Sequence, residues 1–180
     1  NTYSLLDERA SGFFALGIAK STKNPVILNC TSGTALANFF PAIIEARMSE
    51  IPIILLTADR PKKLIDCGEN QTIFQHNFYG KYVLETIDVE CVDNNINSIL
   101  NDINMVYNAS LGIRENQLLS EKGPVHINIH IEEPLLSESM ESDITDFKIT
   151  SINKKTLSNS ILNENFKKPL IVCGQTNLHN

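Results

Sequence analysis

Several side chains that could take part in chemistry stand at the ends of short apolar segments. Glu8 opens a helical pattern, the tetrapeptide Thr31–Thr34 (TSGT) follows an apolar run, and Arg60 comes shortly after another. Ligands of α/β proteins bind outside the carboxyl ends of the strands. These positions are therefore candidates for binding or catalysis.

Each motif also has a purely structural interpretation. An acidic residue such as Glu8 complements the positive end of a helix. The Ser, Thr and Gly of Thr31–Thr34 suit a helix cap and a tight turn. Asp59 and Arg60 could form a surface ion pair, which would contribute less than about 1 kcal/mol. Taken singly, none of the motifs requires a ligand.

The functional interpretation rests on what these groups can bind. The planar guanidinium of Arg60 matches a carboxylate through two hydrogen bonds, and Asn70 and Gln71 place two amides just downstream. Exposed backbone N–H groups and small side chains in Thr31–Thr34 would let a flat ligand approach closely. That turn is not predicted to be a phosphate loop, because the sequence contains neither GxxxxGK[ST] nor GxGxxG.

The elements that must position these residues alternate between strands and helices. The strand-like runs are 25–30, 52–57 and 125–131, and the helical patterns are 8–21, 35–48 and 93–114. This order predicts an α/β domain with a mostly parallel sheet and helices on both faces. The first two runs show no alternation, as expected for parallel strands covered on both faces. The third alternates, with His126, Asn128 and His130 opposite its apolar residues.

Two of the helical patterns carry more detailed expectations. In the pattern 8–21, the predicted buried stripe contains Phe13, Leu16 and Gly17, with Phe14 and Ile18 beside it. In the pattern 35–48, Pro41 predicts a kink or a late start of the helix.

The composition divides the chain into three predicted parts. Residues 1–134 form the α/β domain, with its N-terminus missing because the chain begins with Asn rather than Met. Residues 135–165, rich in Ser, Asp, Glu, Asn and Lys, read as a linker. Residues 166–180, with the run KPLIVCG, begin a second α/β domain.

The overall composition excludes several classes of partner. Of 180 residues, 42% are hydrophobic and 20% charged, as in ordinary globular proteins. The net charge of −6 argues against nucleic acid or an anionic membrane, and no apolar run approaches the roughly 20 residues of a membrane span. Four widely spaced cysteines without a CxxC pair disfavour structural zinc; a reduced cytoplasmic protein is the simplest interpretation.

Together the motifs form a connected set. The segments DERASGFFALGIAK, TSGTALANFFPAIIEA, LLTADRP, GENQTI and GPVHINIHIEEPL resemble the pyrimidine-binding domain of thiamine-diphosphate-dependent enzymes. Within that superfamily they most resemble the 2-succinyl-5-enolpyruvyl-6-hydroxy-3-cyclohexene-1-carboxylate synthases. The resemblance extends over residues 1 to about 135 and implies the fold of that domain.

The resemblance implies a role for each candidate residue. Glu8 is expected to be both catalytic and cofactor-binding, through a hydrogen bond to N1′ of the aminopyrimidine that favours its imino tautomer. The pyrimidine pocket would be formed by Thr31, Ser32, Gly33 and Thr34. The substrates would be contacted by Arg60, Asn70 and Gln71.

The implied reaction belongs to menaquinone biosynthesis. It decarboxylates 2-oxoglutarate, adds the resulting carbanion to isochorismate and releases carbon dioxide, in a homodimer or homotetramer with active sites between subunits. The Gly-Asp-Gly/Ser…Asn motif that holds the diphosphate and Mg²⁺ in this superfamily is absent here, as is the Ser-Arg expected upstream of Glu8. The resemblance thus implies no metal ligand on this chain and no activity of the fragment alone.

Two alternatives remain open. One is another thiamine-diphosphate enzyme, such as an acetolactate synthase or a 2-oxoacid decarboxylase. Those enzymes usually have Gly-Pro-Gly where this chain has Gly33-Thr34-Ala35, and they lack the LTADRP…NQ combination. The other is a non-catalytic α/β module for assembly or regulation, which the fold alone does not exclude. Cofactor binding by the intact protein would separate enzyme from module.

Overall fold

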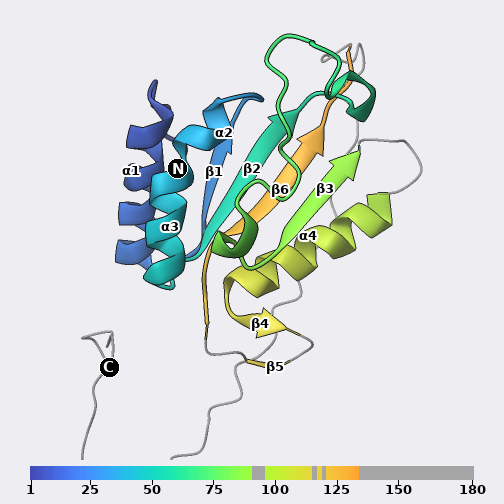
Figure 1. The fold of residues 1–180 in the computed structure, drawn as a ribbon. Helices are drawn as coiled ribbons and strands as arrows, with labels where there is room; N and C mark the ends of the chain where they lie inside the picture. Colours follow the sequence, from blue (N-terminus) through green and yellow to red (C-terminus); the bar gives the residue numbers. More distant parts are fainter. Residues whose placement is uncertain (91–95, 115–116, 119–120, 134–180) are drawn as a thin grey trace, which may run out of the picture.

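The computed structural model describes residues 1–90, 96–114, 117–118 and 121–133. Its main sheet has four parallel strands in the order β1-β2-β6-β3 (Figure 1). These strands are β1 (Val26–Cys30), β2 (Ile53–Asp59), β3 (Thr86–Glu90) and β6 (Val125–His130), while β4 (Ile113–Arg114) and β5 (Gln117–Leu118) form a separate antiparallel pair. The predicted parallel sheet is confirmed. The predicted linker and second domain lie outside the described residues.

The helices follow the predicted patterns with two differences at their ends. They are α1 (Glu8–Thr22), α2 (Ala35–Asn38), α3 (Phe40–Met48) and α4 (Ile96–Ser110), with short 3-10 turns η1 (Lys62–Leu64) and η2 (Gly80–Tyr82). The pattern 35–48 divides at Phe39, and Pro41 lies in the first turn of α3, where its missing N–H is not needed. The predicted end at residue 114 is wrong, because the helix stops at Ser110 and Ile113 already pairs as a strand.

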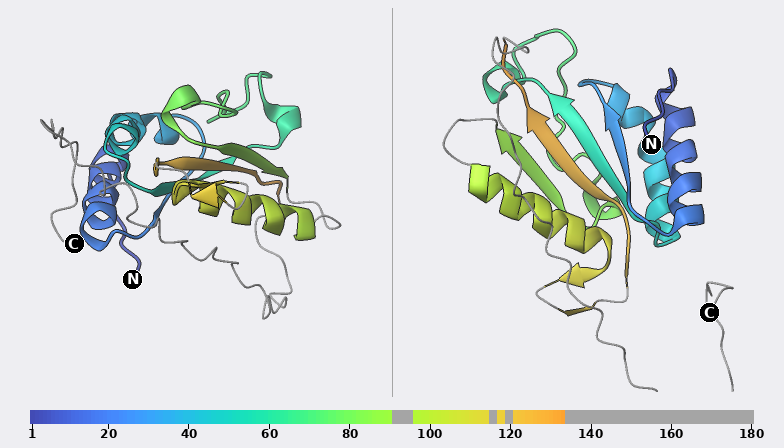
Figure 2. Two further views of the ribbon diagram at one scale, coloured as in Figure 1. Left: turned by 90° about the horizontal axis from the view of Figure 1, so that it is seen from below. Right: turned by 180° about the vertical axis from the view of Figure 1, so that it is seen from behind.

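Helices cover both faces of the sheet, as predicted, and β2 contributes to both cores. Its residues Ile53 and Leu55 pack with α1, α2 and α3. Ile54 and Leu56 face the other way and pack with α4 and the apolar side of β6. Figure 2 shows α4 on the face opposite the segment that joins β2 to β3. The lack of alternation in β2 is therefore explained by burial on both sides.

The same expectation is wrong for β1. The side chains of Ile27 and Asn29 are exposed, Ile27 to 64%, whereas Leu28 and Cys30 are buried. β1 is one of the two edge strands of the sheet, and α4 packs on β6, β3 and β2 rather than on β1. One face of β1 consequently has no cover among the described residues.

The buried stripe of α1 also differs from the prediction. Gly12, Ala15 and Ala19 are buried, whereas Phe13 and Phe14 are 49% and 43% exposed. The reason is the close approach of α1 and α3: a Cβ at Gly12 would lie 3.0 Å from that of Ala42. Only small side chains fit between helices at this spacing, so the phenylalanines point outward.

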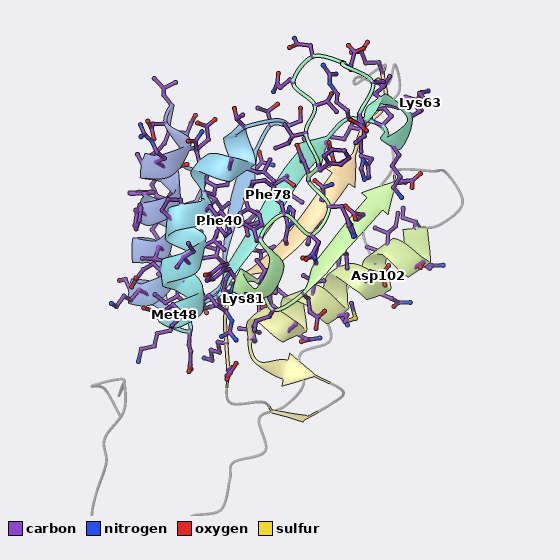
Figure 3. All side chains as sticks on the ribbon, viewed as in Figure 1. Phe40, Met48, Lys63, Phe78, Lys81 and Asp102 are labelled. Atoms are coloured by element: carbon purple, nitrogen blue, oxygen red, sulfur yellow. The ribbon has the colours of Figure 1, made fainter. Side chains whose placement is uncertain are left out.

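The segment between β2 and β3 covers the face of the sheet opposite α4. Phe78 and Tyr79 pack against Phe40 of α3, with ring centroids 5.9 and 5.4 Å apart; Figure 3 labels Phe40 and Phe78 at this contact. The Tyr79 hydroxyl donates to the carbonyl of Leu36 at 2.7 Å, and burial raises its pKa. These contacts attach residues 78–79 to α2 and α3.

Candidate functional site

Three of the predicted motifs lie at one edge of the sheet. β1 and β2 are parallel with Cys30 opposite Thr57, so Thr31 and Arg60 leave the sheet at the same end. α1 runs antiparallel to β1, which brings its first residue to that end too (Figure 1). The nearness of Glu8 to the end of β1 affects Cys30. Burial, and to a smaller extent the negative charge of Glu8, raise the pKa of the Cys30 thiol to about 12. The expected convergence is present.

Glu8 lies in the first turn of α1, where its charge complements the helix dipole as the simpler interpretation expected, but it is not the N-cap. The N-cap of α1 is Asp7, whose Oδ1 accepts a hydrogen bond from the Ala10 N–H at 3.0 Å. Arg9 pairs with Asp7 at 3.2 Å, not with Glu8. Within the described parts of the chain, the half-buried Glu8 carboxylate has no hydrogen-bond or ion-pair partner. It is available to a ligand.

The turn after β1 requires glycine at its centre. Gly33 has φ +78°, and a Cβ there would lie 2.8 Å from Cγ of Gln71. The neighbouring Ser32 hydroxyl donates to the Gln71 carbonyl at 3.0 Å. Ser32 and Gly33 are therefore buried and engaged within the chain, whereas Thr31 and Thr34 on either side are exposed.

Gln71, an expected substrate contact, forms hydrogen bonds with the Thr31–Thr34 turn, which is expected to bind the cofactor. Its amide nitrogen donates to Thr31 Oγ1 at 3.1 Å and to the Ser32 carbonyl at 3.0 Å. The expected substrate-contacting loop is thus in direct contact with the expected cofactor turn. Asn70, the residue before, is exposed, and its side chain forms no hydrogen bond with another described residue.

Arg60 does not form the surface ion pair with Asp59. The Asp59 carboxylate is buried and accepts from the backbone N–H of Arg60 at 2.8 Å, and His130 Nδ1 lies 2.7 Å from the Arg60 carbonyl, to which it donates. The nearest acid to the guanidinium is Glu133, at 3.9 Å from Nη1. Nε is buried without a partner in the described structure. Buried donors of this kind are rare in folded proteins, and an anionic ligand would satisfy this one.

A buried polar cluster lies next to Asp59 and includes Asn128, on the face of β6 that the alternation of polar and apolar residues in 125–131 identified. Asn128 is fully buried, and its Oδ1 accepts from Thr57 Oγ1 at 2.8 Å and from Gln75 Nε2 at 2.9 Å. Its Nδ2 donates to Asp59 Oδ2 at 2.8 Å and to Asp88 Oδ1 at 2.9 Å. An amide has two donors and two acceptor positions. All four are used, so the orientation of Asn128 is fixed.

This orientation determines the state of His126. The Thr57 hydroxyl donates to Asn128, so it must accept from His126 Nε2, 2.8 Å away, and Nε2 carries the proton. Burial lowers the pKa of His126 to about 4, against an opposing effect of Asp88 and with a smaller contribution from His76. His126 is therefore neutral at pH 7.

Asp88 stays ionised beside this cluster. Burial acts to raise its pKa, but the hydrogen bonds from Asn128 and His76 outweigh that effect and hold the pKa of Asp88 below its usual range. Sequence reasoning missed Asp88, because the segment 86–90 alternates with acidic residues and was not recognised as a strand. It also missed Gln75, which no local pattern distinguishes from other loop amides.

Other features of the described residues do not add a second site. They contain no group of three or more His, Cys, Asp or Glu side chains placed to hold a metal ion. No helix among them is long and apolar enough to cross a membrane. A cavity of about 300 Å³ beside His76, Gly80 and Thr86 lies at the start of β3 and includes none of the predicted site residues.

Comparison with known proteins gives one family and a consistent set of relatives. Residues 1–83 match the family described as "Thiamine pyrophosphate enzyme, N-terminal TPP binding domain". Proteins named 2-succinyl-5-enolpyruvyl-6-hydroxy-3-cyclohexene-1-carboxylate synthase are similar to the chain. The one from Bacillus pumilus is 38% identical over 97% of this chain and 31% of its own length. The one from Histophilus somni is 44% identical over 72% of this chain and 22% of its own length. The chain spans about a third of the length of the first of these relatives.

Proposed function

We propose that the chain forms the pyrimidine-binding part of a 2-succinyl-5-enolpyruvyl-6-hydroxy-3-cyclohexene-1-carboxylate synthase, because residues 1–83 match the N-terminal cofactor-binding domain of the thiamine pyrophosphate enzymes and similar proteins carry that synthase name. One observation carries the proposal. A carboxylate, Glu8, and a buried guanidinium nitrogen, Arg60 Nε, end without partners among the described residues at the same edge of the sheet.

The residues at this edge fit the aminopyrimidine half of thiamine diphosphate. When bound, this cofactor supplies a centre that holds the electron pair left by decarboxylation of a 2-oxoacid. Glu8 would accept a hydrogen bond from a ring nitrogen and share its proton, since nothing else in the described structure occupies its carboxylate. Thr31 and Thr34, exposed on both sides of the buried Ser32 and Gly33, would line the pocket.

Arg60 and the loop 70–71 would bind substrate. The substrates of the proposed reaction, 2-oxoglutarate and isochorismate, both carry carboxylates, and a guanidinium binds a carboxylate through charge-assisted hydrogen bonds. Asp59 and His130 hold the backbone of Arg60 on both sides. The guanidinium can therefore turn towards a ligand without moving the turn that carries it. The exposed Asn70 side chain would contact hydroxyl groups, together with the Gln71 side-chain oxygen.

The rest of the proposal concerns the whole protein. Magnesium and the diphosphate would be bound by residues outside this chain, and active sites would form between subunits of a homodimer or homotetramer. The product would enter menaquinone biosynthesis in the cytoplasm. The chain by itself would have no activity, because it supplies only one side of the site.

The test is a reconstitution with the full-length protein that carries this chain. With thiamine diphosphate, Mg²⁺, 2-oxoglutarate and isochorismate, mass spectrometry should detect 2-succinyl-5-enolpyruvyl-6-hydroxy-3-cyclohexene-1-carboxylate together with released carbon dioxide. Carbon–carbon bond formation from pyruvate instead of 2-oxoglutarate would favour an acetolactate synthase-like enzyme. Failure to bind thiamine diphosphate at all would favour the non-catalytic module.

A further inference from the structure

We infer that Gln75 is a positioning residue, which keeps the Thr31–Thr34 turn and Arg60 in fixed relation through a buried chain of hydrogen bonds. The inference rests on the proposed function, because it concerns how the two sides of that site are aligned. Gln75 lies in the loop between β2 and β3, and its side chain is fully buried.

The Gln75 amide connects the ends of two strands. Its Oε1 accepts from the Gly33 N–H, in the turn after β1, at 2.9 Å. Its Nε2 donates to the Ala58 carbonyl in β2 at 3.0 Å and to Asn128 Oδ1 at 2.9 Å. Both donors of the amide and its oxygen are thus used, so a flip would break all three contacts.

The chain of hydrogen bonds continues from Asn128 to Arg60. Asn128 Nδ2 donates to Asp59 Oδ2 at 2.8 Å, and Asp59 Oδ1 accepts from the Arg60 N–H at 2.8 Å. Gly33 and Arg60 are 27 residues apart in sequence, yet three buried side chains link their backbone N–H groups. Gln75, Asn128 and Asp59 together are called the amide bridge below.

The amide bridge consists of buried polar side chains, and its contacts to the two turns are hydrogen bonds. The two ends of the bridge are the backbones of the turns that carry the proposed cofactor and substrate contacts. Without Gln75 Oε1, the buried Gly33 N–H has no acceptor, and the turn would shift to find one. A shift of about 1 Å in a positioning group can cost a hundredfold in rate.

The experiment uses the full-length protein and the variant Gln75→Met, which keeps the length of the side chain and removes its hydrogen bonds. The Kd for thiamine diphosphate with Mg²⁺, the KM for isochorismate and kcat are measured well below the melting temperature. We expect a higher Kd and a kcat/KM lower by roughly tenfold to a hundredfold.

A second variant cuts the bridge at its far end. In Asp59→Asn only one side-chain oxygen remains to accept the hydrogen bonds from the Arg60 N–H and from Asn128. The link to Arg60 therefore weakens, while Gln75 still accepts from Gly33. The expected result is a raised KM for isochorismate with an unchanged Kd for thiamine diphosphate. This separation is a readout that general loss of stability would not produce. If Gln75→Met does not fold, the KM of Asp59→Asn still tests the inference.

Asn108→Leu serves as the matched control, because it removes another buried amide, on α4 at the other face of the sheet. It should lower the melting temperature and leave Kd and KM unchanged. The inference is overturned if Gln75→Met behaves like this control, or if a folded Asp59→Asn protein keeps the wild-type KM. If wild-type protein fails to bind thiamine diphosphate, the proposed function itself fails and the inference falls with it.

Discussion

Asp7 and Glu8 are adjacent acidic residues at the start of one helix, and their contacts differ. Asp7 caps α1 by accepting a hydrogen bond from the Ala10 N–H, and it also pairs with Arg9. The hydrogen bond from Ala10, and after it the contact with Arg9, lower the pKa of the Asp7 carboxyl. Glu8 makes neither contact and remains half-buried beside the end of β1. A residue with a stabilising role would be expected to have such contacts, so Glu8 is the better candidate for ligand binding.

The variant Glu8→Gln should separate folding from cofactor chemistry. It should lower stability by only a few tenths of a kcal/mol, through the weakened interaction with the helix dipole. The amide keeps the shape of the carboxylate but cannot share a ring proton, so C2–H/D exchange of bound thiamine diphosphate should slow strongly. The exchange rate is measured by quenched NMR on the full-length protein, together with its melting temperature. Equal exchange rates in wild type and variant would remove the proposed role, and a collapsed melting temperature would make Glu8 structural.

Arg60→Ala should weaken catalysis more than cofactor binding. Loss of a charge-assisted contact to a carboxylate costs about 1.5–3 kcal/mol, which corresponds to roughly ten- to more than hundredfold in kcat/KM. Steady-state kinetics with both substrates provide the measurement. Arg9→Ala is the control, since the Arg9 guanidinium lies on the surface and pairs only with Asp7 among the described residues. If Arg60→Ala and Arg9→Ala have the same kinetics, Arg60 has no part in substrate binding.

At the scale of elements, β6 carries two different faces. Its apolar side packs on α4, and its polar side holds His126, Asn128 and His130 under the loop from β2 to β3. A buried polar face of this kind needs complete hydrogen bonding to avoid a large desolvation cost. Asn128 meets that requirement. His126 meets it at Nε2, which donates to Thr57, whereas its Nδ1 is buried without a partner among the described residues.

The buried neutral His126 predicts acid sensitivity of the domain. The pKa of His126 is lowered to about 4 in the folded chain from an ordinary value of 6.5, so the unfolded chain binds the extra proton first. The free energy of unfolding should therefore be highest above pH 6.5 and fall between pH 6.5 and 4, by up to about 3 kcal/mol. Urea unfolding at several pH values measures this slope. The variant His126→Gln, which can still donate to Thr57, should have a shallower slope; an identical slope would contradict the prediction.

At the scale of the whole molecule, the described surface keeps several large apolar side chains exposed. Two gather on the outside of α1, Phe13 and Phe14; others are Ile27 on the open face of β1 and Phe74 in the loop over the strand ends. If the chain supplies one part of a site, as proposed, other segments or another subunit would cover Phe13 and Phe14, which are adjacent on α1.

We proposed that Mg²⁺ and the diphosphate are bound by residues outside this chain. This arrangement predicts how the melting temperature of the full-length protein responds to Mg²⁺. Thiamine diphosphate should raise its melting temperature only with Mg²⁺ present, and chelation with EDTA should abolish the shift. A ligand at a hundred times its Kd stabilises a protein by about 2.7 kcal/mol. The 180-residue chain alone should show no Mg²⁺-dependent shift, because its described residues offer no cluster of metal ligands. A Mg²⁺-dependent shift of the isolated chain, followed by differential scanning fluorimetry, would overturn this arrangement.

The sequence by itself predicted the parallel sheet, the strands β1, β2 and β6, the helix α1 and the candidate positions, because these follow from local patterns. Apolar runs mark strands, although β2 is covered on both faces and β1 on only one. The residues after a strand end lie at one edge of a parallel sheet. It also identified the polar face of β6, since alternation along a strand is a property of neighbouring residues.

Only the tertiary structure decided which partner each side chain meets. The exposure of Phe13 and Phe14 follows from the close contact of Gly12 with Ala42, and no helical periodicity contains that distance. The amide bridge depends likewise on Gln75, which meets Gly33 from 42 residues away in sequence. Such contacts depend on the spacing of packed elements, and that spacing is set by the fold as a whole.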